Sequence, residues 1–129
     1  MASNQSSAKT VLIVEDSPTQ AENIRVMLAE YGLNVMCAFD GPSGLEKAKE
    51  IHPDLIVMDV NMPGMNGFQV ALELKSNPKS AGIPIVMLTS RDTPESLMMG
   101  LGAGAIDYIP KDVFAMSVLI ETVRQMGLI

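Results

Sequence analysis

Five short apolar segments recur along the chain, each followed by a segment with the hydrophobic spacing of an amphipathic helix. The apolar segments are short and are bounded by turn residues, so we expect strands that are buried on both faces. They are predicted at residues 10–14, 34–39, 55–58, 83–88 and 105–109. Strands that alternate with helices in this way indicate a parallel sheet with right-handed crossovers.

The segments between the strands carry helix start and stop signals. Helices are predicted at residues 18–31, 43–51 and 68–75, from about residue 93 to the glycines near 100, and at 113–126. Pro18 suits a first helical turn, and either Asp92 or Thr93 caps the fourth helix ahead of Pro94. Glycines weaken the tail of the fourth helix, so we expect it to be short and comparatively mobile.

Five strands and five helices in alternation predict an α/β protein, a three-layer α/β/α sandwich. The common order for a five-stranded sheet of this kind is the flavodoxin-like 2-1-3-4-5. In that order the chain reverses direction across the sheet between the first and third strands, and ligands bind in the crevice at their carboxyl ends. Glu15 and Asp16 follow the first strand and Asp59 follows the third, so this order places the three side by side.

The composition fits one globular domain at residues 10–129, behind a polar and flexible arm at residues 1–9. Cys37 is the only cysteine, which excludes a disulfide framework and favours a reducing cytoplasm. The net charge of −6, with no cluster of Lys and Arg, opposes direct binding of nucleic acid. No apolar run approaches the ~20 residues that span a membrane, and the N-terminus has no apolar signal core.

Three carboxylates at one crevice repel one another, which raises a pKa or recruits a cation. Oxygen ligands suit Mg²⁺, with Mn²⁺ as the alternative ion, and Mg²⁺ binds through a few carboxylates together with a phosphate group. The single His52 and single Cys37 lie elsewhere in the pattern, which argues against a transition-metal site. We interpret His52, next to Pro53 at the opposite end of the sheet, as structural.

The fourth and fifth strands end near Thr89 and Lys111, at the same edge of the sheet. A hydroxyl donor and an ammonium group suit the oxygens of a phosphoryl group. Together with carboxylates and Mg²⁺ they indicate phosphoryl transfer onto an aspartate. Asp59 alone is equally consistent with a helix cap, but its central place between the acidic pair, Thr89 and Lys111 favours the role of nucleophile.

Six motifs, in this order and spacing, resemble a response-regulator receiver domain. They are Val14-Glu-Asp-Ser-Pro18, Phe39-Asp-Gly41, Asp54-Leu-Ile-Val-Met-Asp59, Met62-Pro-Gly-Met-Asn-Gly67, Pro84-Ile-Val-Met-Leu-Thr-Ser90 and Gly104-Ala-Ile-Asp-Tyr-Ile-Pro-Lys111. The resemblance extends over nearly the whole chain, from about Lys9 to Met126. A chain of this kind is either a stand-alone receiver, similar to chemotaxis regulators, or part of a longer regulator or hybrid kinase.

The resemblance implies a role for each site residue. Asp59 would accept a phosphoryl group from the phosphohistidine of a sensor histidine kinase, from a phosphotransfer protein or from a small phosphodonor. Mg²⁺ would be held by Glu15, Asp16, Asp59 and the main-chain carbonyl of Asn61. Lys111 would pair with the phosphoryl group, while Asn61 and Arg91 would tune dephosphorylation.

The same resemblance implies a switch and a partner. Thr89 would move toward the phosphoryl group, and Tyr108 would rotate inward and remodel the surface of the fourth helix, fifth strand and fifth helix. That surface would control a downstream protein, with the receiver as a monomer or a phosphorylation-dependent dimer. Such a protein is no enzyme in the ordinary sense, because it catalyses only its own phosphorylation and dephosphorylation. Tyr108 as a plain core aromatic remains the alternative.

Two positions depart from the family pattern. The family usually has proline directly after the lysine, often with a cis bond, whereas here Pro110 precedes Lys111 and Asp112 follows it. A cis bond between Lys111 and Asp112 would cost ~3 kcal/mol, so we expect either a trans bond or a strained exception. Asn66 stands where the family commonly has Asp, and we interpret it as a neutral substitution in a turn.

Three other functions compete with this interpretation. An aspartyl-phosphate hydrolase of the haloacid-dehalogenase type needs a second Asp two residues after the nucleophile, where this chain has Asn61. A flavodoxin-like electron carrier binds a phosphate after the first strand, where Glu15 and Asp16 would repel it. A receiver-like docking module that is never phosphorylated would not need all the reactive residues that are present here.

Overall fold

The computed structural model describes residues 8–90 and 93–129. Its strands form one parallel sheet in the order β2-β1-β3-β4-β5, which confirms the predicted order. The strands are β1 (Thr10–Val14), β2 (Asn34–Ala38), β3 (Leu55–Met58), β4 (Ile85–Thr89) and β5 (Asp107–Pro110). The carboxyl ends of β1 and β3 are therefore neighbours at the centre of the sheet.

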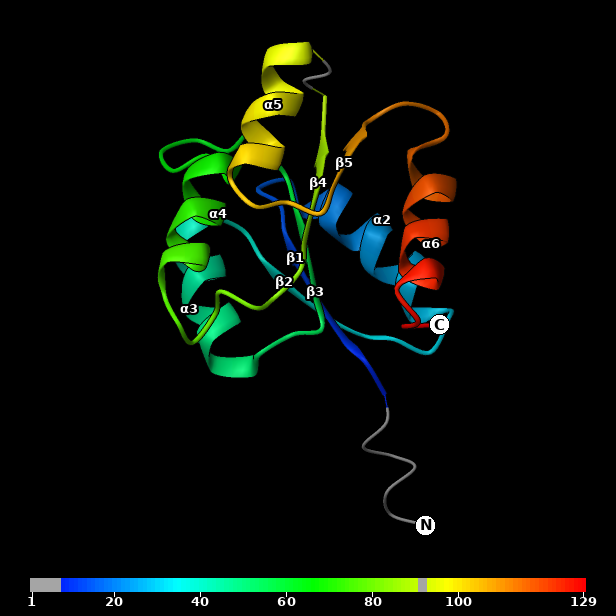
Figure 1. The fold of residues 1–129 in the computed structure, drawn as a ribbon. Coiled ribbons are helices and arrows are strands. Elements are labelled where there is room, and N and C mark those ends of the chain that lie inside the picture. The colour runs from blue at the N-terminus through cyan, green and yellow to red at the C-terminus, as the bar shows by residue number, and fades with distance from the viewer. Residues whose placement is uncertain (1–7, 91–92) are drawn as a thin grey trace.

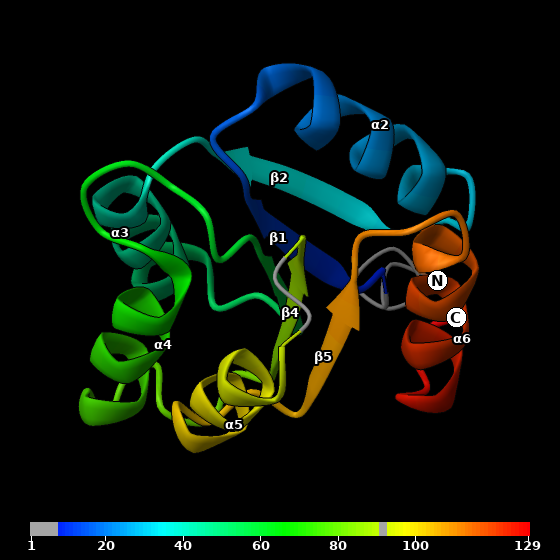
Figure 2. The same ribbon diagram turned by 90° about the horizontal axis from the view of Figure 1, so that it is seen from above.

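Helices cover both faces of the sheet and complete the predicted three-layer α/β/α architecture (Figures 1 and 2). They are α2 (Pro18–Ala29), α3 (Gly41–Ile51), α4 (Gly67–Ser76), α5 (Pro94–Gly102) and α6 (Ala115–Gln125). Seen along the sheet in Figure 2, α3, α4 and α5 lie on one face, and α2 and α6 lie on the other. At nine residues α5 is the shortest helix of the described chain, as its glycines predict.

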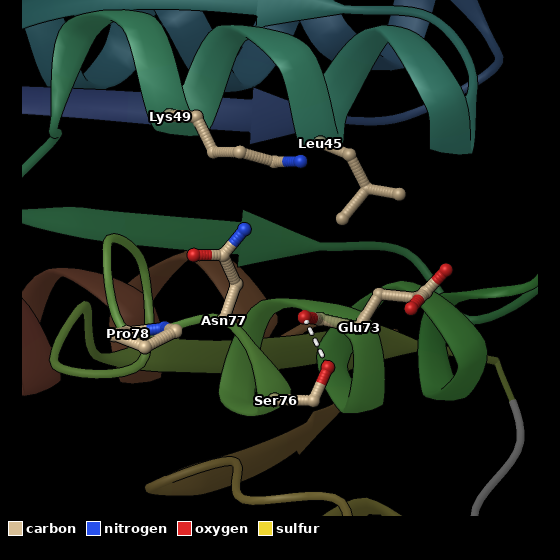
Figure 3. A pocket seen from close by; sticks show the side chains of 6 residues that line it. All are labelled: Leu45, Lys49, Glu73, Ser76, Asn77 and Pro78. Atoms are coloured by element: carbon tan, nitrogen blue, oxygen red, sulfur yellow. Dashed lines mark hydrogen bonds between the residues drawn. The ribbon is translucent and has the colours of Figure 1, made fainter.

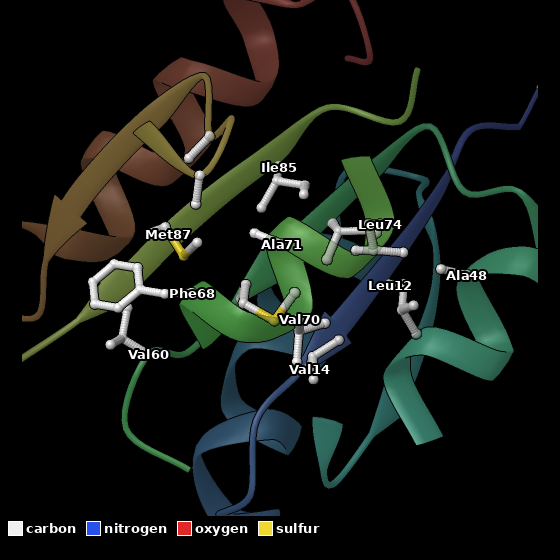
Figure 4. Close-up of a cluster of buried hydrophobic side chains, with 14 of the residues drawn as sticks. Leu12, Val14, Ala48, Val60, Phe68, Val70, Ala71, Leu74, Ile85 and Met87 are labelled. Carbon is white, nitrogen blue, oxygen red and sulfur yellow. The ribbon is translucent and has the colours of Figure 1, made fainter. Parts of the chain in front are cut away.

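The hydrophobic core lies in two layers, one on each face of the sheet. The layer under α3, α4 and α5 includes Leu12, Phe68, Leu74 and Met87 (Figure 4). The layer under α2 and α6 is built on the alternate side chains of the same strands, such as Ile13 and Leu88. Because both faces are covered, β3 and β4 are buried at every residue, which explains their uninterrupted apolar sequences.

Local polar contacts explain where the helices begin and end. Asn66 caps α4 in a complete capping box with Gln69, so this Asn serves the helix start directly. Thr93 caps α5 by accepting a hydrogen bond from the Ser96 N–H at 3.1 Å, and Asp92 lies outside the described residues. His52 ends α3 in a left-handed conformation with φ 49°, in agreement with its predicted structural role.

The predicted start of the last helix is wrong by two residues. The Asp112 carboxylate accepts a hydrogen bond from the Phe114 N–H at 2.8 Å, and this local turn competes with helical bonding. The helix α6 therefore begins at Ala115 rather than at Val113. Val113, the predicted first residue of this helix, instead precedes it and is 89% exposed.

Two further predictions concern the N-terminal arm and helices that could span a membrane. Of the predicted arm at residues 1–9, residues 1–7 lie outside the described residues. None of the helices in the described part of the chain combines the length and hydropathy required to cross a bilayer.

Gly67 is a close-packing point between α4 and the end of β3. A Cβ atom at this position would lie 2.9 Å from the Val60 Cα and would also collide with the Asp59 carbonyl oxygen. Both neighbours are backbone and cannot yield without moving the Asp59 segment. We therefore expect Gly67→Ala to lower the free energy of unfolding by about 1–3 kcal/mol in urea denaturation.

Gly82→Ala is the matched control for this substitution. No atom lies within 4 Å of a Cβ built at Gly82, and its backbone is not in the left-handed region. Its free energy of unfolding should stay within about 1 kcal/mol of the wild-type value, on either side. Equal stabilities of the two variants would contradict the packing argument.

Candidate functional site

The sheet register brings the acidic residues together. Val14 of β1 pairs with Met58 of β3, so Glu15 and Asp59 follow neighbouring positions on adjacent strands. The Asp59 N–H donates to the Val14 carbonyl at 2.9 Å and extends the pairing by one residue. Glu15, Asp16 and Asp59 each offer a carboxylate oxygen, and these oxygens lie within 4.8 Å of one another.

Two of these carboxylates are deeply buried, since Glu15 is 3% exposed and Asp59 is 5% exposed. Burial raises the pKa of Glu15 above its ordinary value, and the nearby charge of Asp59 raises it further. Hydrogen bonds from Lys111 and from the Ser17 N–H act in the opposite direction on the same pKa. The crevice therefore concentrates negative charge in a place where water cannot fully solvate it.

Lys111 supplies the positive charge of the site. Its Nζ donates to the Glu15 Oε1 at 3.0 Å and lies 3.5 Å from the Asp59 Oδ1. The Lys111 main-chain N–H donates to the Thr89 carbonyl at 2.7 Å, so the end of β4 fixes where the lysine leaves the sheet. A third contact joins the Lys111 Nζ to the Gln20 Oε1 of α2, at 2.7 Å.

Thr89 is the last residue of β4 and its side chain is completely buried. It pairs with Pro110 of β5, directly before Lys111, so the hydroxyl and the ammonium come from adjacent strand ends as predicted. Beyond Thr89, the Ser90 Oγ accepts a hydrogen bond from the Asn61 Nδ2 at 2.9 Å. This bond connects the loops that follow β3 and β4. Arg91, which we expected to tune dephosphorylation, lies outside the described residues.

Tyr108 lies in the core layer on the α5 side of the sheet and is 9% exposed. Gly100 of α5 makes room for its ring, because a Cβ at Gly100 would lie 2.7 Å from the Tyr108 Cδ1. The ring thus occupies an inward position next to α5 in this structure. The Lys111–Asp112 bond is trans, the first of the two alternatives, since the described chain contains no cis peptide bond.

The donor set fits a hard divalent cation. Its ligand atoms are carboxylate oxygens held close together, which is the coordination that Mg²⁺ and Mn²⁺ accept. Cys37 lies on the edge strand β2 and His52 ends α3, so neither belongs to this cluster. The Asn61 N–H donates to the Asp59 Oδ1 at 3.3 Å, which places the Asn61 backbone beside the carboxylates.

A surface hollow of about 340 Å³ lies between α3 and α4, away from this cluster (Figure 3). It is lined by Leu45 and Lys49 of α3 and by Glu73, Ser76, Asn77 and Pro78. Ser76 and Asn77 end α4 at the amino edge of the sheet, opposite the edge where the acidic residues gather. The hollow contains none of the predicted site residues.

The structure adds two contacts that the sequence patterns did not reveal. Gln20 reaches Lys111 from α2, and Ser90 connects to Asn61 across the loops. The spacing of Ser17 and Gln20 marks a capping box, which is a signal for a helix start but not for a contact with Lys111. No local signal in the sequence links Ser90 to Asn61, because the contact depends on two loops 29 residues apart in the chain.

Comparison with known proteins agrees with this geometry. The family model described as "Response regulator receiver domain" matches residues 11–124. Protein PilH of Pseudomonas aeruginosa is 37% identical over 103 residues, which cover 80% of this chain and 85% of PilH. The DNA-binding response regulator MtrA of Mycolicibacterium smegmatis is 36% identical over 114 residues, but the match spans only 48% of MtrA.

Solved structures give the same result. The chemotaxis protein CheY4 of Vibrio cholerae superposes with a TM-score of 0.85 at 32% identity, over 92% of this chain and 98% of that chain. A signal receiver domain of a histidine kinase from Syntrophus aciditrophicus has a TM-score of 0.83 at 36% identity, over 92% of this chain and 89% of that one. The family model covers well over half of the chain, and the similar proteins and solved structures support the same family. This chain therefore belongs to the response regulator receiver domain family of two-component signalling.

Proposed function

We propose that the protein accepts a phosphoryl group on Asp59 from the phosphohistidine of a sensor histidine kinase, from a phosphotransfer protein or from a small phosphodonor. The observation that carries this proposal is the buried Asp59 carboxylate, flanked by Glu15 and contacted by the Lys111 ammonium at 3.5 Å. Membership of the receiver family and the nearby hydroxyl of Thr89 support the same role.

In the transfer step, a carboxylate oxygen of Asp59 attacks the phosphorus atom of the donor. The new P–O bond forms as the P–N bond of the phosphohistidine breaks, and the imidazole leaves with the bonding electron pair. Lys111 neutralises charge on the phosphoryl oxygens, and the Thr89 hydroxyl donates a hydrogen bond to one of them. Hydrolysis of the acyl phosphate by water returns the Asp59 carboxylate and releases inorganic phosphate.

Glu15, Asp16, Asp59 and the main-chain carbonyl of Asn61 would hold Mg²⁺, or Mn²⁺, beside the reacting group. Such an ion supplies positive charge to the phosphoryl oxygens during transfer. The proximity of the carboxylate oxygens and the raised pKa of Glu15 support this assignment. Asn61 stands where a hydrolase would place an acid, so the protein would catalyse only its own phosphorylation and dephosphorylation.

Phosphorylation would act on the surface formed by α5, β5 and α6. Thr89 would move toward the phosphoryl group. Tyr108, which we expected to rotate inward, already has its ring buried beside α5, so phosphorylation would hold it in this inward position. This surface exposes large apolar side chains, among them Met98, Phe114 and Val118, which suits a protein partner. The net charge of −6 disfavours nucleic acid as the target, so we propose a downstream protein target instead. The receiver would act in the cytoplasm, as a monomer or as a phosphorylation-dependent dimer.

Incubation with acetyl phosphate and Mg²⁺ should add the mass of one phosphoryl group to the intact protein. Asp59→Asn should abolish this gain, because an amide is not a nucleophile of this kind. Mass spectrometry of the intact chain measures both results. The gain should also disappear when EDTA removes the metal.

Asp40→Asn is the matched control, since Asp40 caps α3 and Asn is an equally good cap. It should gain phosphoryl mass like the wild type. A wild-type protein that gains no mass, or an Asp59→Asn variant that gains as much as the wild type, would overturn the proposed function.

Mg²⁺ should also stabilise the fold. Because burial raises the pKa of Glu15, its ionised form opposes folding, and this cost is absent in acid but present at neutral pH. A bound cation relieves the cost, and a ligand at a hundred times its dissociation constant stabilises by about 2.7 kcal/mol. Thermal unfolding at neutral pH, with NaCl at the same ionic strength as the reference, should show this gain.

Asp16→Asn should lose most of the gain from Mg²⁺ and should be no less stable than the wild type without metal, since it removes a like charge. An equal gain in the wild type and in Asp16→Asn would show that the ion binds elsewhere.

A further inference from the structure

The start of α2 has the residues of a capping box, Ser17 and Gln20, but only one of the two hydrogen bonds of a complete box is formed there. Ser17 is the cap, and its Oγ accepts a hydrogen bond from the Gln20 N–H at 3.3 Å. In a closed box the Gln side chain would accept in return from the Ser17 N–H. Here the Ser17 N–H donates to the Glu15 Oε2 at 3.1 Å, so that donor is already engaged.

The same protein contains a closed box for comparison. At the start of α4, the Gln69 N–H donates to the Asn66 Oδ1 at 3.0 Å, and the Asn66 N–H donates to the Gln69 Oε1 at 2.8 Å. Gln20 and Gln69 are the same residue type at the same helical position. The different path of the Gln20 side chain therefore comes from its surroundings and not from helix geometry.

The carbonyl of Gln20 is directed to the Lys111 ammonium instead. At 2.7 Å this is the shortest of the three contacts that Lys111 Nζ makes with described residues of the site, ahead of Glu15 at 3.0 Å and Asp59 at 3.5 Å. An ammonium group has three donor hydrogens, and Gln20 and Glu15 take two of them at normal hydrogen-bond lengths. The group therefore sits closer to Gln20 and Glu15 than to Asp59.

We propose that Gln20 is a positioning residue for Lys111, which holds the ammonium toward α2 in the resting protein and releases it when Asp59 carries a phosphoryl group. This inference rests on the proposed function of Asp59. A Glu15 carboxylate that turns toward a cation would free the Ser17 N–H, and Gln20 would then close its box as Gln69 does. The side chain of Gln20 thus has two acceptor positions, one for each state of the site.

A contact that exists only in the resting state opposes phosphorylation, so its removal should favour the phosphorylated state. Beryllofluoride with Mg²⁺ is the probe, as a stable analogue of the phosphoryl group, and fluorine NMR gives its dissociation constant. Gln20→Met keeps the length of the side chain but has no acceptor carbonyl, so it removes both the bond to Lys111 and the bond that would close the box. The bond to the charged ammonium is the stronger of the two, so the loss falls mainly on the resting state. Because Gln20 is exposed and its bond modest, we expect this variant to bind beryllofluoride about 3- to 10-fold more tightly.

Three variants define the mechanism. Gln20→Glu offers Lys111 a charged acceptor and should weaken beryllofluoride binding, opposite to Gln20→Met. Gln69→Met opens the box of α4, so it should lower the thermal unfolding temperature while it leaves beryllofluoride affinity unchanged. In a Lys111→Met background, Gln20→Met should no longer tighten beryllofluoride binding, because the tightening depends on the ammonium.

A second readout uses the resting protein without metal. In heteronuclear NMR spectra, Lys111→Met should shift the side-chain amide signals of Gln20 and leave those of Gln69 in place. The proposal would be overturned if Gln20→Met bound beryllofluoride with the wild-type affinity, or if it still bound more tightly in the Lys111→Met background. It would also be overturned if Lys111→Met left the NMR signals of the Gln20 side-chain amide unchanged. A wild-type protein that binds no beryllofluoride would instead remove the proposed function, and this inference with it.

Discussion

The ion pair between Lys111 and the buried carboxylates of Glu15 and Asp59 is the interaction on which the site depends. Two nearly inaccessible carboxylates, with Asp16 beside them, face one ammonium group, so the cluster retains negative charge at the end of the central strands. Burial of this charge costs stability unless it is paired. In the function that we propose, a divalent cation would offset the remaining negative charge and would complement the charge of a phosphoryl group on Asp59.

The sheet supplies the geometry that this charge cluster needs. Parallel pairing of β1 with β3 aligns Glu15 with Asp59, and pairing of β4 with β5 brings Thr89 next to Lys111. Backbone hydrogen bonds extend both pairs beyond the strands, from Asp59 to Val14 and from Lys111 to Thr89. Gly67 lets the start of α4 approach the backbone of Asp59 and Val60 closely, so the position of this helix also depends on the segment that carries Asp59. The carboxylate, hydroxyl and ammonium groups of the site are thus held at the ends of paired strands.

The sequence predicted the architecture well, because uninterrupted apolar runs report strands buried on both faces and their alternation with helices limits the topology. It also predicted that Glu15, Asp16, Asp59, Thr89 and Lys111 gather at one edge of the sheet, since each lies at the carboxyl end of a strand or just after it. It failed at Val113, where hydrophobic spacing could not reveal that the Asp112 side chain delays the helix. It did not reveal the link from Asn61 to Ser90 or the turn of Gln20 toward Lys111, because long-range side-chain contacts leave no periodic pattern.

We propose that Asp59, and neither of its acidic neighbours, forms the acyl phosphate. Borohydride reduces an aspartyl phosphate to homoserine, so reduction after treatment with acetyl phosphate, followed by peptide sequencing, marks the acceptor directly. We expect homoserine at position 59 and unchanged residues at Glu15 and Asp16. A reduced residue at either neighbour, or no reduced residue at all, would contradict this proposal.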